Sequence, residues 1–515
     1  MNGADALCET LLAHGIDTCF ANPGTSEMHF VSALDRQPRM RCVLGLFEGV
    51  VTGAADGYAR MADKPAATLL HLGSGLGNGL ANLHNARRAN TPMVNIVGDH
   101  ATDHLQYDAP LTSDIAAIAG AVSHWVRSTA GPDQVSHDAR DAIAAAWSPP
   151  GQIATLILPA DAAWGETNRV VAPATRASRA APDEAAVRAV AEAIRSGKKT
   201  TLLLGDVALR GKALQTAGRI AKATGVRLLA QQANKRLERG RGRVPLDRVQ
   251  YRVADAIAQF ADTEVLALVG AQSPVAFFAY PDMPSTPIGA HTEVLQLAGG
   301  EADLCQALQQ LAGELRIPRD VVPDVAPVWS DGLPRGDLTV DKLAVAVAAL
   351  LPEHAIIVDE GITAGRAIYS ATQSAAPHDY LQLTGGAIGS GLPMATGAGL
   401  ACPDRKVVSV QADGSGMYTL QALWTQAREK LDVVTIILAN RRYAILHGEL
   451  KNVGANKAGA NASLMLDLDR PELDWCAFAK GAGVEAARAT TAEELCDLLT
   501  AACAKRGPFL IEAML

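Results

Sequence analysis

The sequence predicts an α/β protein built from three doubly wound parallel-sheet domains. Short apolar runs alternate with helical segments, and three successive regions of the chain show this pattern. The 515 residues are 49 % hydrophobic and only 19 % charged, so the chain can bury large cores and is not mainly disordered. We expect an N-terminal domain at 1–172, a central domain at 185–318 and a C-terminal domain at 338–515, joined by Pro-rich linkers.

The expected elements follow the same pattern in each domain. Apolar runs too short for helices are expected to be buried strands. In the N-terminal domain the expected helices are 4–15, 50–63 and 79–90, and the expected strands are 18–24, 41–48, 66–75, 91–99 and 154–160. The other two domains add strands at 200–206, 226–231, 264–271, 292–298, 355–361, 406–414, 432–440 and 509–515.

Composition and local patterns exclude several classes of protein. The net charge is −8, and no basic stripe indicates nucleic-acid binding. The sequence has no uncharged apolar run of about 18 residues and no signal-peptide pattern, so we expect a cytoplasmic protein with no membrane partner. The eight cysteines are scattered without a C-x-x-C pair, which favours reduced thiols over a zinc site or disulfides.

Polar residues follow two apolar strands of the C-terminal domain. Asp413 and Gly414 end one strand, and Asn440 ends the next. Ligands of open α/β sheets bind at such strand ends, and a carboxylate, an amide oxygen and backbone carbonyls suit Mg²⁺, which also shares phosphate oxygens. The N–H groups of Gly414 and Ser415 could face a phosphate. A plain turn before a helix would look the same.

Two weaker signals lie elsewhere. Glu48 follows an apolar strand and opens a helix, where it could serve only as a favourable N-terminal charge. The segment 385–393 places several glycines around Ile388, which indicates either a backbone close to a flat ligand or a glycine-rich start of a helix.

The order and spacing of these three signals resemble the thiamine diphosphate (ThDP) dependent 2-oxo acid decarboxylase and acetolactate synthase family, with benzoylformate decarboxylase closest in motifs. The resemblance implies the ThDP cofactor and Mg²⁺. It assigns Glu48 to the pyrimidine nitrogen, Ile388 to the wedge that bends the cofactor, and the Gly386 carbonyl to its amino group. The remaining cofactor residues that it implies are Gly361, Ile362 and Thr363 at the diphosphate, with Asp413, Gly414, Ser415, Asn440 and Tyr443.

For the metal, the resemblance implies the side chains of Asp413 and Asn440 and the carbonyl of Arg442. The family's Gly-Asp-Gly is Ala412-Asp413-Gly414 here, and its Asn-Asn pair is Ala439-Asn440. Both ligand positions are present, so we expect binding. The central domain has no G-x-G-x-x-G fingerprint, and we expect no FAD.

The resemblance also implies catalytic and substrate residues. His71 aligns with a decarboxylase histidine suited to proton transfer, and Thr25 with a substrate-contacting serine; a strand-end histidine and a turn hydroxyl are the plainer interpretations. The second decarboxylase histidine is missing from 270–282, where Phe277 and Phe278 stand instead. The expected substrate pocket consists of Leu111, Phe277, Phe278, Ile445, Leu446 and Glu449, although Glu449 could equally be a solvated helix residue.

The sequence therefore predicts a ThDP- and Mg²⁺-dependent enzyme that decarboxylates a small 2-oxo acid, like benzoylformate decarboxylase, with or without forming a new C–C bond. One alternative is an acetolactate synthase-like carboligase. A second is a non-catalytic binding subunit of the same fold, although retention of buried Glu48, Asp413 and Asn440 weighs against it. Because family members build each site from two chains, the resemblance implies a homodimer at least. It also implies a homotetramer, since tetramers are frequent in the family.

Overall fold

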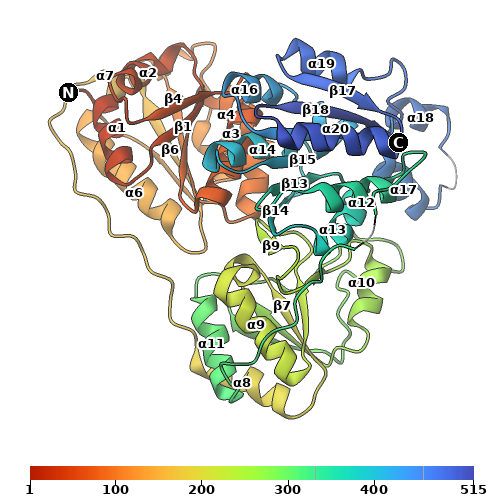
Figure 1. Ribbon diagram of the computed structural model, residues 1–515. Helices are drawn as coiled ribbons and strands as arrows, with labels where there is room; N and C mark the ends of the chain where they lie inside the picture. Colours follow the sequence, from red (N-terminus) through yellow and green to blue (C-terminus); the bar gives the residue numbers. More distant parts are fainter. Residues whose placement is uncertain (331, 456–457) are drawn as a thin grey trace.

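The N-terminal domain is a six-stranded parallel sheet covered by helices on both faces (Figure 1). The computed structural model describes residues 1–330, 332–455 and 458–515 of the chain. The strand order is β2-β1-β3-β4-β6-β5. The strands are β1 (Thr18–Asn22), β2 (Arg41–Leu44), β3 (Ala66–Leu70), β4 (Met93–Asp99), β5 (Trp125–Ser128) and β6 (Ile153–Pro159). The helices are α1 (Gly3–Ala13), α2 (Met28–Asp35), α3 (Glu48–Ala62), α4 (Leu72–Arg88), α5 (Ile115–Gly120), α6 (Val135–Trp147) and α7 (Ala160–Trp164).

The central domain repeats this architecture on a smaller scale, and the connection from α7 runs along the outside of the molecule to reach it (Figure 1). Its parallel sheet has the order β10-β8-β7-β11-β12. The strands are β7 (Thr200–Leu204), β8 (Arg227–Ala230), β10 (Asp247–Arg248), β11 (Val265–Val269) and β12 (Glu293–Ala298). The helices are α8 (Glu184–Arg195), α9 (Gly211–Thr224), α10 (Val253–Phe260) and α11 (Leu304–Glu314).

The C-terminal domain has a seven-stranded sheet in the order β17-β18-β16-β15-β13-β14-β9. Its own strands are β13 (Ile356–Glu360), β14 (His378–Gln382), β15 (Val407–Ala412), β16 (Val433–Ala439), β17 (Glu485–Ala489) and β18 (Phe509–Met514). Its helices are α12 (Val340–Leu350), α13 (Gly365–Ala371), α14 (Gly391–Ala401), α15 (Asp413–Gly416), α16 (Ala422–Arg428), α17 (Ala444–Asn452), α18 (Ala460–Leu466), α19 (Trp475–Gly481) and α20 (Ala492–Ala504). The predicted fold class, three parallel-sheet α/β domains, is confirmed.

The seventh strand of that sheet comes from another part of the chain. β9 (Leu237–Arg239) lies within the stretch 185–318 that we expected to form the central domain, but it pairs antiparallel with β14. Its three residues face His378, Asp379 and Tyr380 in the ladder. The central stretch therefore supplies the edge of the C-terminal sheet.

Two strands of the N-terminal domain are shorter than predicted. The strand expected at 41–48 ends at Leu44, and α3 begins at Glu48. The expectation of a strand as far as residue 75 is wrong, because β3 ends at Leu70 and α4 begins at Leu72. The first turns of α4 contain glycines, which are poor helix formers, because neighbouring side chains lie too close for a larger residue. A Cβ added to Gly73 would lie 2.0 Å from the Ser113 hydroxyl oxygen, and one added to Gly75 would lie 3.0 Å from Glu48 Oε1.

The N- and C-terminal domains pack through helices α3 and α14. A Cβ added to Gly57 would lie 2.1 Å from the Met394 carbonyl oxygen, and one added to Gly397 would lie 1.9 Å from the Ala54 carbonyl oxygen. Only glycine lets these two backbones approach so closely. This crossing fixes the start of α3 beside the segment 385–390 that precedes α14.

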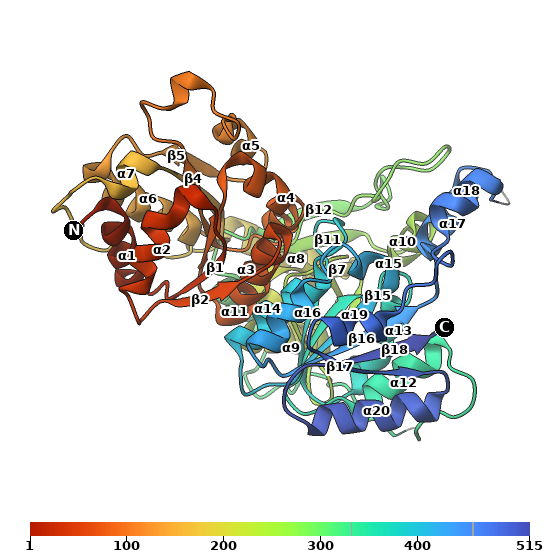
Figure 2. The same ribbon diagram turned by 90° about the horizontal axis from the view of Figure 1, so that it is seen from above.

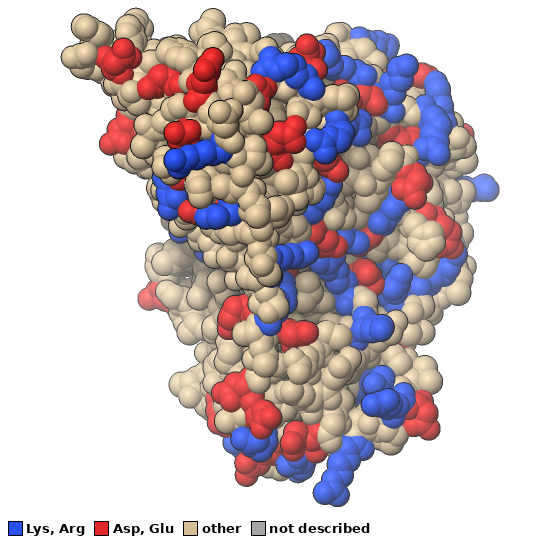
Figure 3. All heavy atoms as spheres, turned by 90° about the vertical axis from the view of Figure 1, so that its left-hand side faces the viewer, with Lys and Arg blue, Asp and Glu red and all other residues tan. Residues whose placement is uncertain are grey.

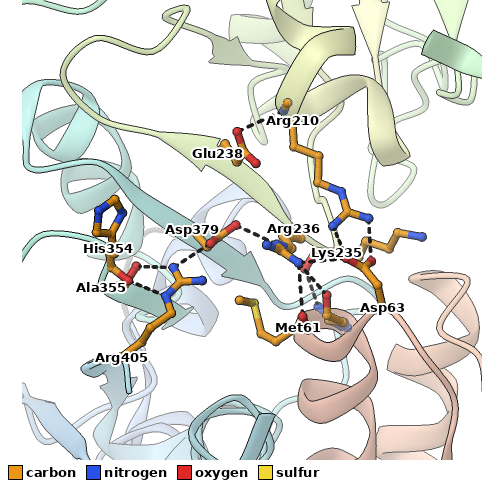
Figure 4. Close-up of polar contacts among 12 residues, drawn as sticks. Met61, Asp63, Arg210, Lys235, Arg236, Glu238, His354, Ala355, Asp379 and Arg405 are labelled. Atoms are coloured by element: carbon orange, nitrogen blue, oxygen red, sulfur yellow. Dashed lines mark hydrogen bonds and ion pairs between the residues drawn. The ribbon is translucent and has the colours of Figure 1, made fainter. Parts of the chain in front are cut away.

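An ion-pair network joins all three domains (Figure 4). Asp63, at the end of α3, accepts two hydrogen bonds from Arg210 of the central domain and lies 3.3 Å from Arg236. Arg236 donates in turn to Asp379 of β14, which also accepts from Arg405. Burial works to raise the pKa of Asp379, but the two guanidiniums hold it below its ordinary value. Breaking one partner of such a buried pair is costly, so the network fixes the domain arrangement.

The molecular surface carries mixed charge. Figure 3 shows Lys and Arg interspersed with Asp and Glu over one whole face, in place of a continuous basic stripe on that face. A search of the described residues finds no helix with the length and apolar character that crossing a membrane requires.

Candidate functional site

Glu48 is the first residue of α3 and is only 6 % exposed. Its Oε2 accepts a hydrogen bond of 3.0 Å from the side-chain amide of Asn78 on α4. Gly75 leaves room for the other carboxylate oxygen, as its missing Cβ would lie 3.0 Å away. A carboxylate at a helix N-terminus is stabilised in its charged form, so the position suits a buried acceptor.

His71 follows β3 directly and is held by a residue that the sequence analysis missed. Its Nδ1 lies 2.8 Å from Oε2 of Glu27, whose side chain is 1 % exposed. Glu27 also accepts from the Gly24 N–H and the Ser26 hydroxyl, each at 2.7 Å. A proton on Nδ1 bonded to this carboxylate leaves the Nε2 lone pair available for proton transfer. Glu27 escaped notice because a carboxylate just before a helix looks like an ordinary N-terminal charge.

Thr25 is exposed at the start of the short 3₁₀ turn at 25–27. Its neighbour Ser26, which the sequence analysis did not select, points its hydroxyl towards Glu27 and lies 3.3 Å from His71 Nδ1. The structure therefore places Thr25 and His71 beyond the carboxyl ends of β1 and β3, which are adjacent strands, with Ser26 between them.

Asp413 and Asn440 lie side by side because β15 and β16 are adjacent parallel strands, with Ala412 opposite Leu438. Asp413 is 3 % exposed and accepts from the backbone N–H groups of Gly414 (2.8 Å) and Arg441 (2.7 Å). Burial raises the pKa of Asp413 above its ordinary value. Asn440 Oδ1 accepts from the Arg442 N–H at 3.1 Å. Each side chain is thus oriented by backbone donors and keeps oxygen lone pairs for a cation.

The residues around this pair fit tightly. A Cβ added to Gly414 would lie 2.5 Å from the Tyr443 ring, so only glycine fits under that tyrosine. The Gly414 N–H is already engaged by Asp413, and the Ser415 hydroxyl accepts from Gln411 at 2.6 Å. The carbonyl of Arg442 accepts from the Ala444 N–H at 3.0 Å, which leaves it one lone pair.

Backbone strain marks the predicted cofactor segments. Ile362, between Gly361 and Thr363, has φ +49°, and Leu72, directly after His71, has φ +48°. Left-handed backbone is rare for branched side chains and costs about 1–3 kcal/mol, so it persists where surrounding structure enforces it and often at functional sites. Arg441, directly after Asn440, also has a positive φ of 56°.

Ile388 sits in a turn at 385–389 between Gly386 (φ +79°) and Gly389 (φ +95°). This turn is anchored by a second residue that the sequence analysis missed, Glu360 at the end of β13. Its carboxylate accepts from the N–H groups of Gly389, at 2.5 Å, and Gly391. Complete burial raises the pKa of Glu360 to about 7 against these hydrogen bonds. The sequence analysis missed Glu360 because it follows an apolar run and precedes Gly361, as an ordinary polar residue at the end of a strand does.

The expected substrate residues come from three segments. Phe277, in the long connection between β11 and β12, lies against the turn, since a Cβ on Gly386 would be 2.7 Å from its ring. Figure 2 shows this connection reaching out towards α17. There Tyr280 donates a 2.7 Å hydrogen bond to Glu449. Phe278 packs edge-on against Phe277.

The other expected pocket residues are less enclosed. Ile445 and Leu446 lie on α17, which has no buried residue, and Leu446 is 43 % exposed. Leu111 lies on an exposed loop before α5 in a different domain. Among the described residues, no hydrogen bond or ion pair joins Glu48 or His71 to Asp413 or Asn440. We call the groups around Glu48 and His71 the N-terminal half-site, and those around Asp413, Asn440 and the turn at 385–389 the C-terminal half-site.

The C-terminal half-site fits a diphosphate-bearing cofactor with Mg²⁺. Its donor set is a carboxylate, an amide oxygen and a carbonyl, which is an oxygen shell too small to enclose a cation alone. In agreement, no group of three His, Cys, Asp or Glu side chains converges on a metal position among the described residues. The buried Ser390 hydroxyl, two residues after Ile388, has no hydrogen-bond partner among the described residues. Asp413, Asn440 and Arg442 would hold the cation, and the turn 385–389 would hold the cofactor ring.

Comparisons with known proteins agree with this geometry. Residues 1–121 match the N-terminal TPP binding domain of thiamine pyrophosphate enzymes, and residues 364–513 match the C-terminal TPP binding domain. Thiamine pyrophosphate is another name for ThDP. The first match contains Glu48 and His71, and the second contains Ile388, Asp413 and Asn440.

Relatives extend the likeness to the whole chain. A Mycobacterium tuberculosis protein provisionally named acetolactate synthase large subunit IlvX is 54 % identical, with 100 % of this chain and 99 % of that protein covered. Benzoylformate decarboxylase of Pseudomonas aeruginosa is 29 % identical over 98 % of this chain and 97 % of the relative. The solved structure of a ThDP-dependent 4-hydroxybenzoylformate decarboxylase from Rhodococcus jostii has a TM-score of 0.85 at 26 % identity, covering 99 % of this chain and 98 % of the other. The chain belongs to the ThDP-dependent enzyme family.

Proposed function

We propose that this protein is a ThDP- and Mg²⁺-dependent carboligase of the acetolactate synthase type, which decarboxylates a 2-oxo acid and joins the remaining acyl group to a second carbonyl compound. The 54 % identical relative carries the provisional name acetolactate synthase large subunit. The observation in the structure that carries the proposal is the connection between β11 and β12. It covers the turn at 385–389 with the ring of Phe277 and contains no histidine at 270–282.

The reasoning concerns the fate of the acyl group. When bound, ThDP would supply a nucleophilic carbon for the 2-oxo acid carbonyl and an electron sink for the loss of CO₂. Releasing an aldehyde requires a proton donor close to the reacting carbon. Phe277 and Phe278 cannot donate a proton, and the Tyr280 proton is directed to Glu449. An aromatic wall without a donor favours capture by a second carbonyl.

The chain's own groups have separate roles in this proposal. Glu48 would share a proton with the cofactor's pyrimidine nitrogen, and its burial keeps water from competing. Asp413, Asn440 and the Arg442 carbonyl hold Mg²⁺, which neutralises the diphosphate. His71, oriented by Glu27, moves a proton at Nε2 for the bound 2-oxo acid or acceptor.

The proposal includes a homodimer at least. Glu48 bonds to α4 of its own domain, while Asp413 and Asn440 lie at the carboxyl ends of two central strands of the C-terminal sheet. In the proposal, a second copy supplies the Glu48 that completes each site. Light scattering should find a dimer or tetramer in the active preparation. An active monomer would contradict this part of the proposal.

A second candidate function is a benzoylformate decarboxylase-like enzyme that releases an aldehyde. The His71–Glu27 pair favours it, because an imidazole oriented by a buried carboxylate can supply the required proton. The 29 % identical decarboxylase and the 4-hydroxybenzoylformate decarboxylase structure support the same class.

One experiment separates the two functions. The purified protein is incubated with ThDP, Mg²⁺ and a panel of aliphatic and aromatic 2-oxo acids, with and without a second carbonyl compound. CO₂ and carbon products are measured together. We expect CO₂ with a new C–C bond. CO₂ with free aldehyde as the main product would favour the decarboxylase, and no CO₂ from any acid despite ThDP binding would contradict both.

A further inference from the structure

Helix α4 carries three asparagines on one face. Asn78, Asn82 and Asn85 are spaced by four and three residues, which places them one above another on a helix. Asn78 donates to Glu48. Asn82 and Asn85 are 3 % and 1 % exposed, so their amides must find partners inside the protein.

The amides of Asn82 and Asn85 form one connected network. Asn82 Nδ2 donates to the Gly49 carbonyl in the first turn of α3 (2.8 Å) and to the Gly389 carbonyl (3.3 Å). Asn85 Nδ2 donates to Asn82 Oδ1 (3.1 Å) and to the Ala387 carbonyl (2.7 Å). Asn85 Oδ1 accepts from the Ala387 N–H at 3.2 Å. Each NH₂ group thus uses both of its hydrogens.

These bonds hold the residues on both sides of Ile388. Asn85 pairs with the donor and the acceptor of Ala387 as a neighbouring strand would, and Asn82 holds Gly389. The turn needs such support because Gly386 and Gly389 have positive φ angles and no side chains of their own to anchor it. On its other side, Glu360 accepts from Gly389 and the Thr419 hydroxyl donates to the same residue's carbonyl at 2.8 Å.

We propose that Asn82 and Asn85 are positioning residues of the cofactor site, which fix the turn bearing Ile388 to helix α4 of the same chain. This inference rests on the proposed ThDP-dependent function. Neither asparagine is placed against the reacting atoms. They act by holding the cofactor-contacting turn of the C-terminal domain against the N-terminal domain of its own chain, whose Glu48 serves the second site of the proposed dimer. A fully satisfied polar network suits this task because displacing either element would leave buried groups unpaired.

The test compares Asn85→Ala and Asn82→Ala with Asn95→Ala. Asn95 is an equally buried asparagine on β4 that bonds only to Thr68 and Thr155 within its own domain. Measured on the full-length protein with Mg²⁺ are the Kd of ThDP by calorimetry, the circular dichroism of the bound aminopyrimidine, kcat and KM, and the unfolding midpoint.

We expect Asn85→Ala and Asn82→Ala, each of which removes three side-chain hydrogen bonds, to weaken ThDP binding by about tenfold and to change the dichroism of the bound cofactor. All three variants should lower the unfolding midpoint by comparable amounts. Asn95→Ala should nevertheless keep its ThDP affinity within about twofold of the wild type. If Asn85→Ala does not fold, Asn85→Asp keeps the acceptor for the Ala387 N–H and loses only the donors. It should show the same change in dichroism.

Two results would overturn the inference. Wild-type affinity and dichroism in the folded asparagine variants would make the network merely structural and leave the proposed function standing. Failure of the wild-type protein to bind ThDP would remove the proposed function and this inference with it.

Discussion

The proposed cofactor side and the proposed substrate side of the C-terminal domain are built differently. In the turn at 385–389 and at the two strand ends, Gly389 and Asp413 are buried, and Ile388 and Asn440 are partly buried. These segments are held by backbone and side-chain hydrogen bonds, and the turn receives them from both domains. By contrast, α17 and α18 have no buried residue, and Glu449 is attached to the central domain through Tyr280. The difference shows that hydrogen bonding and burial are concentrated around the proposed cofactor site, while the helices of the proposed substrate side are more open to solvent. Substitutions should therefore be costly at the first region and mild at the second.

The largest effect is expected at Asp413. Asp413→Ala removes the one carboxylate of the donor set and should weaken Mg²⁺-dependent ThDP binding by at least about a hundredfold, measured by calorimetry. The exposed Asp404, on the same domain, is the control, and Asp404→Ala should bind as the wild type does. Equal affinities for the two variants would remove Asp413 from the metal site.

Glu48→Gln should come next and separate binding from turnover. The amide keeps the shape and the bond to Asn78 but cannot share a proton as the carboxylate does. We expect ThDP to bind within about tenfold of the wild type while kcat falls by about 10²–10⁴. Full turnover in this variant would exclude Glu48 from the mechanism.

A pH effect should distinguish Glu360, on the ordered side of the comparison. Burial raises its pKa from 4.5 in the unfolded chain to about 7 in the fold. Between these values the folded protein holds a proton that the unfolded chain has lost, so this group's contribution to stability falls as pH rises from about 4.5 to 7. The change is about 3 kcal/mol.

Denaturant titrations of wild type and Glu360→Gln across that pH range measure this contribution. The free energy of unfolding of the wild type should decline relative to the variant as pH rises. Parallel pH dependences would show that the carboxyl of Glu360 titrates normally despite its burial.

The smallest effect is expected on the substrate side. Tyr280→Phe deletes the hydroxyl that donates to Glu449 but keeps the ring. Because both partners are accessible to water, we expect less than about 1 kcal/mol of lost stability and less than about a fivefold change in KM, with the ThDP Kd unchanged. A large loss of ThDP affinity would show that α17 belongs to the ordered region after all.

The sequence predicts the strands that consist mainly of apolar residues, such as β15 and β16. It therefore also predicts that Asp413 and Asn440 lie at the ends of these strands. It does not predict β14, which is fully buried although it reads His-Asp-Tyr-Leu-Gln. Its Asp379 carboxylate is satisfied by the distant partners Arg236 and Arg405. Hydrophobic periodicity cannot reveal a strand stabilised in this way.

The same limit applies to the candidate site. Glu48, Asp413 and Ile388 stand next to strand ends or glycines and could be selected by type and place. Glu27 and Glu360 matter because of contacts across 44 and 29 to 31 positions of chain, with His71, Gly389 and Gly391. Such contacts exist only once the sheets have formed, so no local pattern announces them.

The strand β9 has a consequence for how the molecule can be divided. β14 would be an open sheet edge without it, and an unpaired edge is a template for association with other chains. Cutting out the central domain at its apparent boundaries would expose that edge and remove Arg236 from Asp379 in the same step. The central domain therefore acts as a built-in cover for its neighbour. A deletion that spares β9 should stay in solution better than one that removes it.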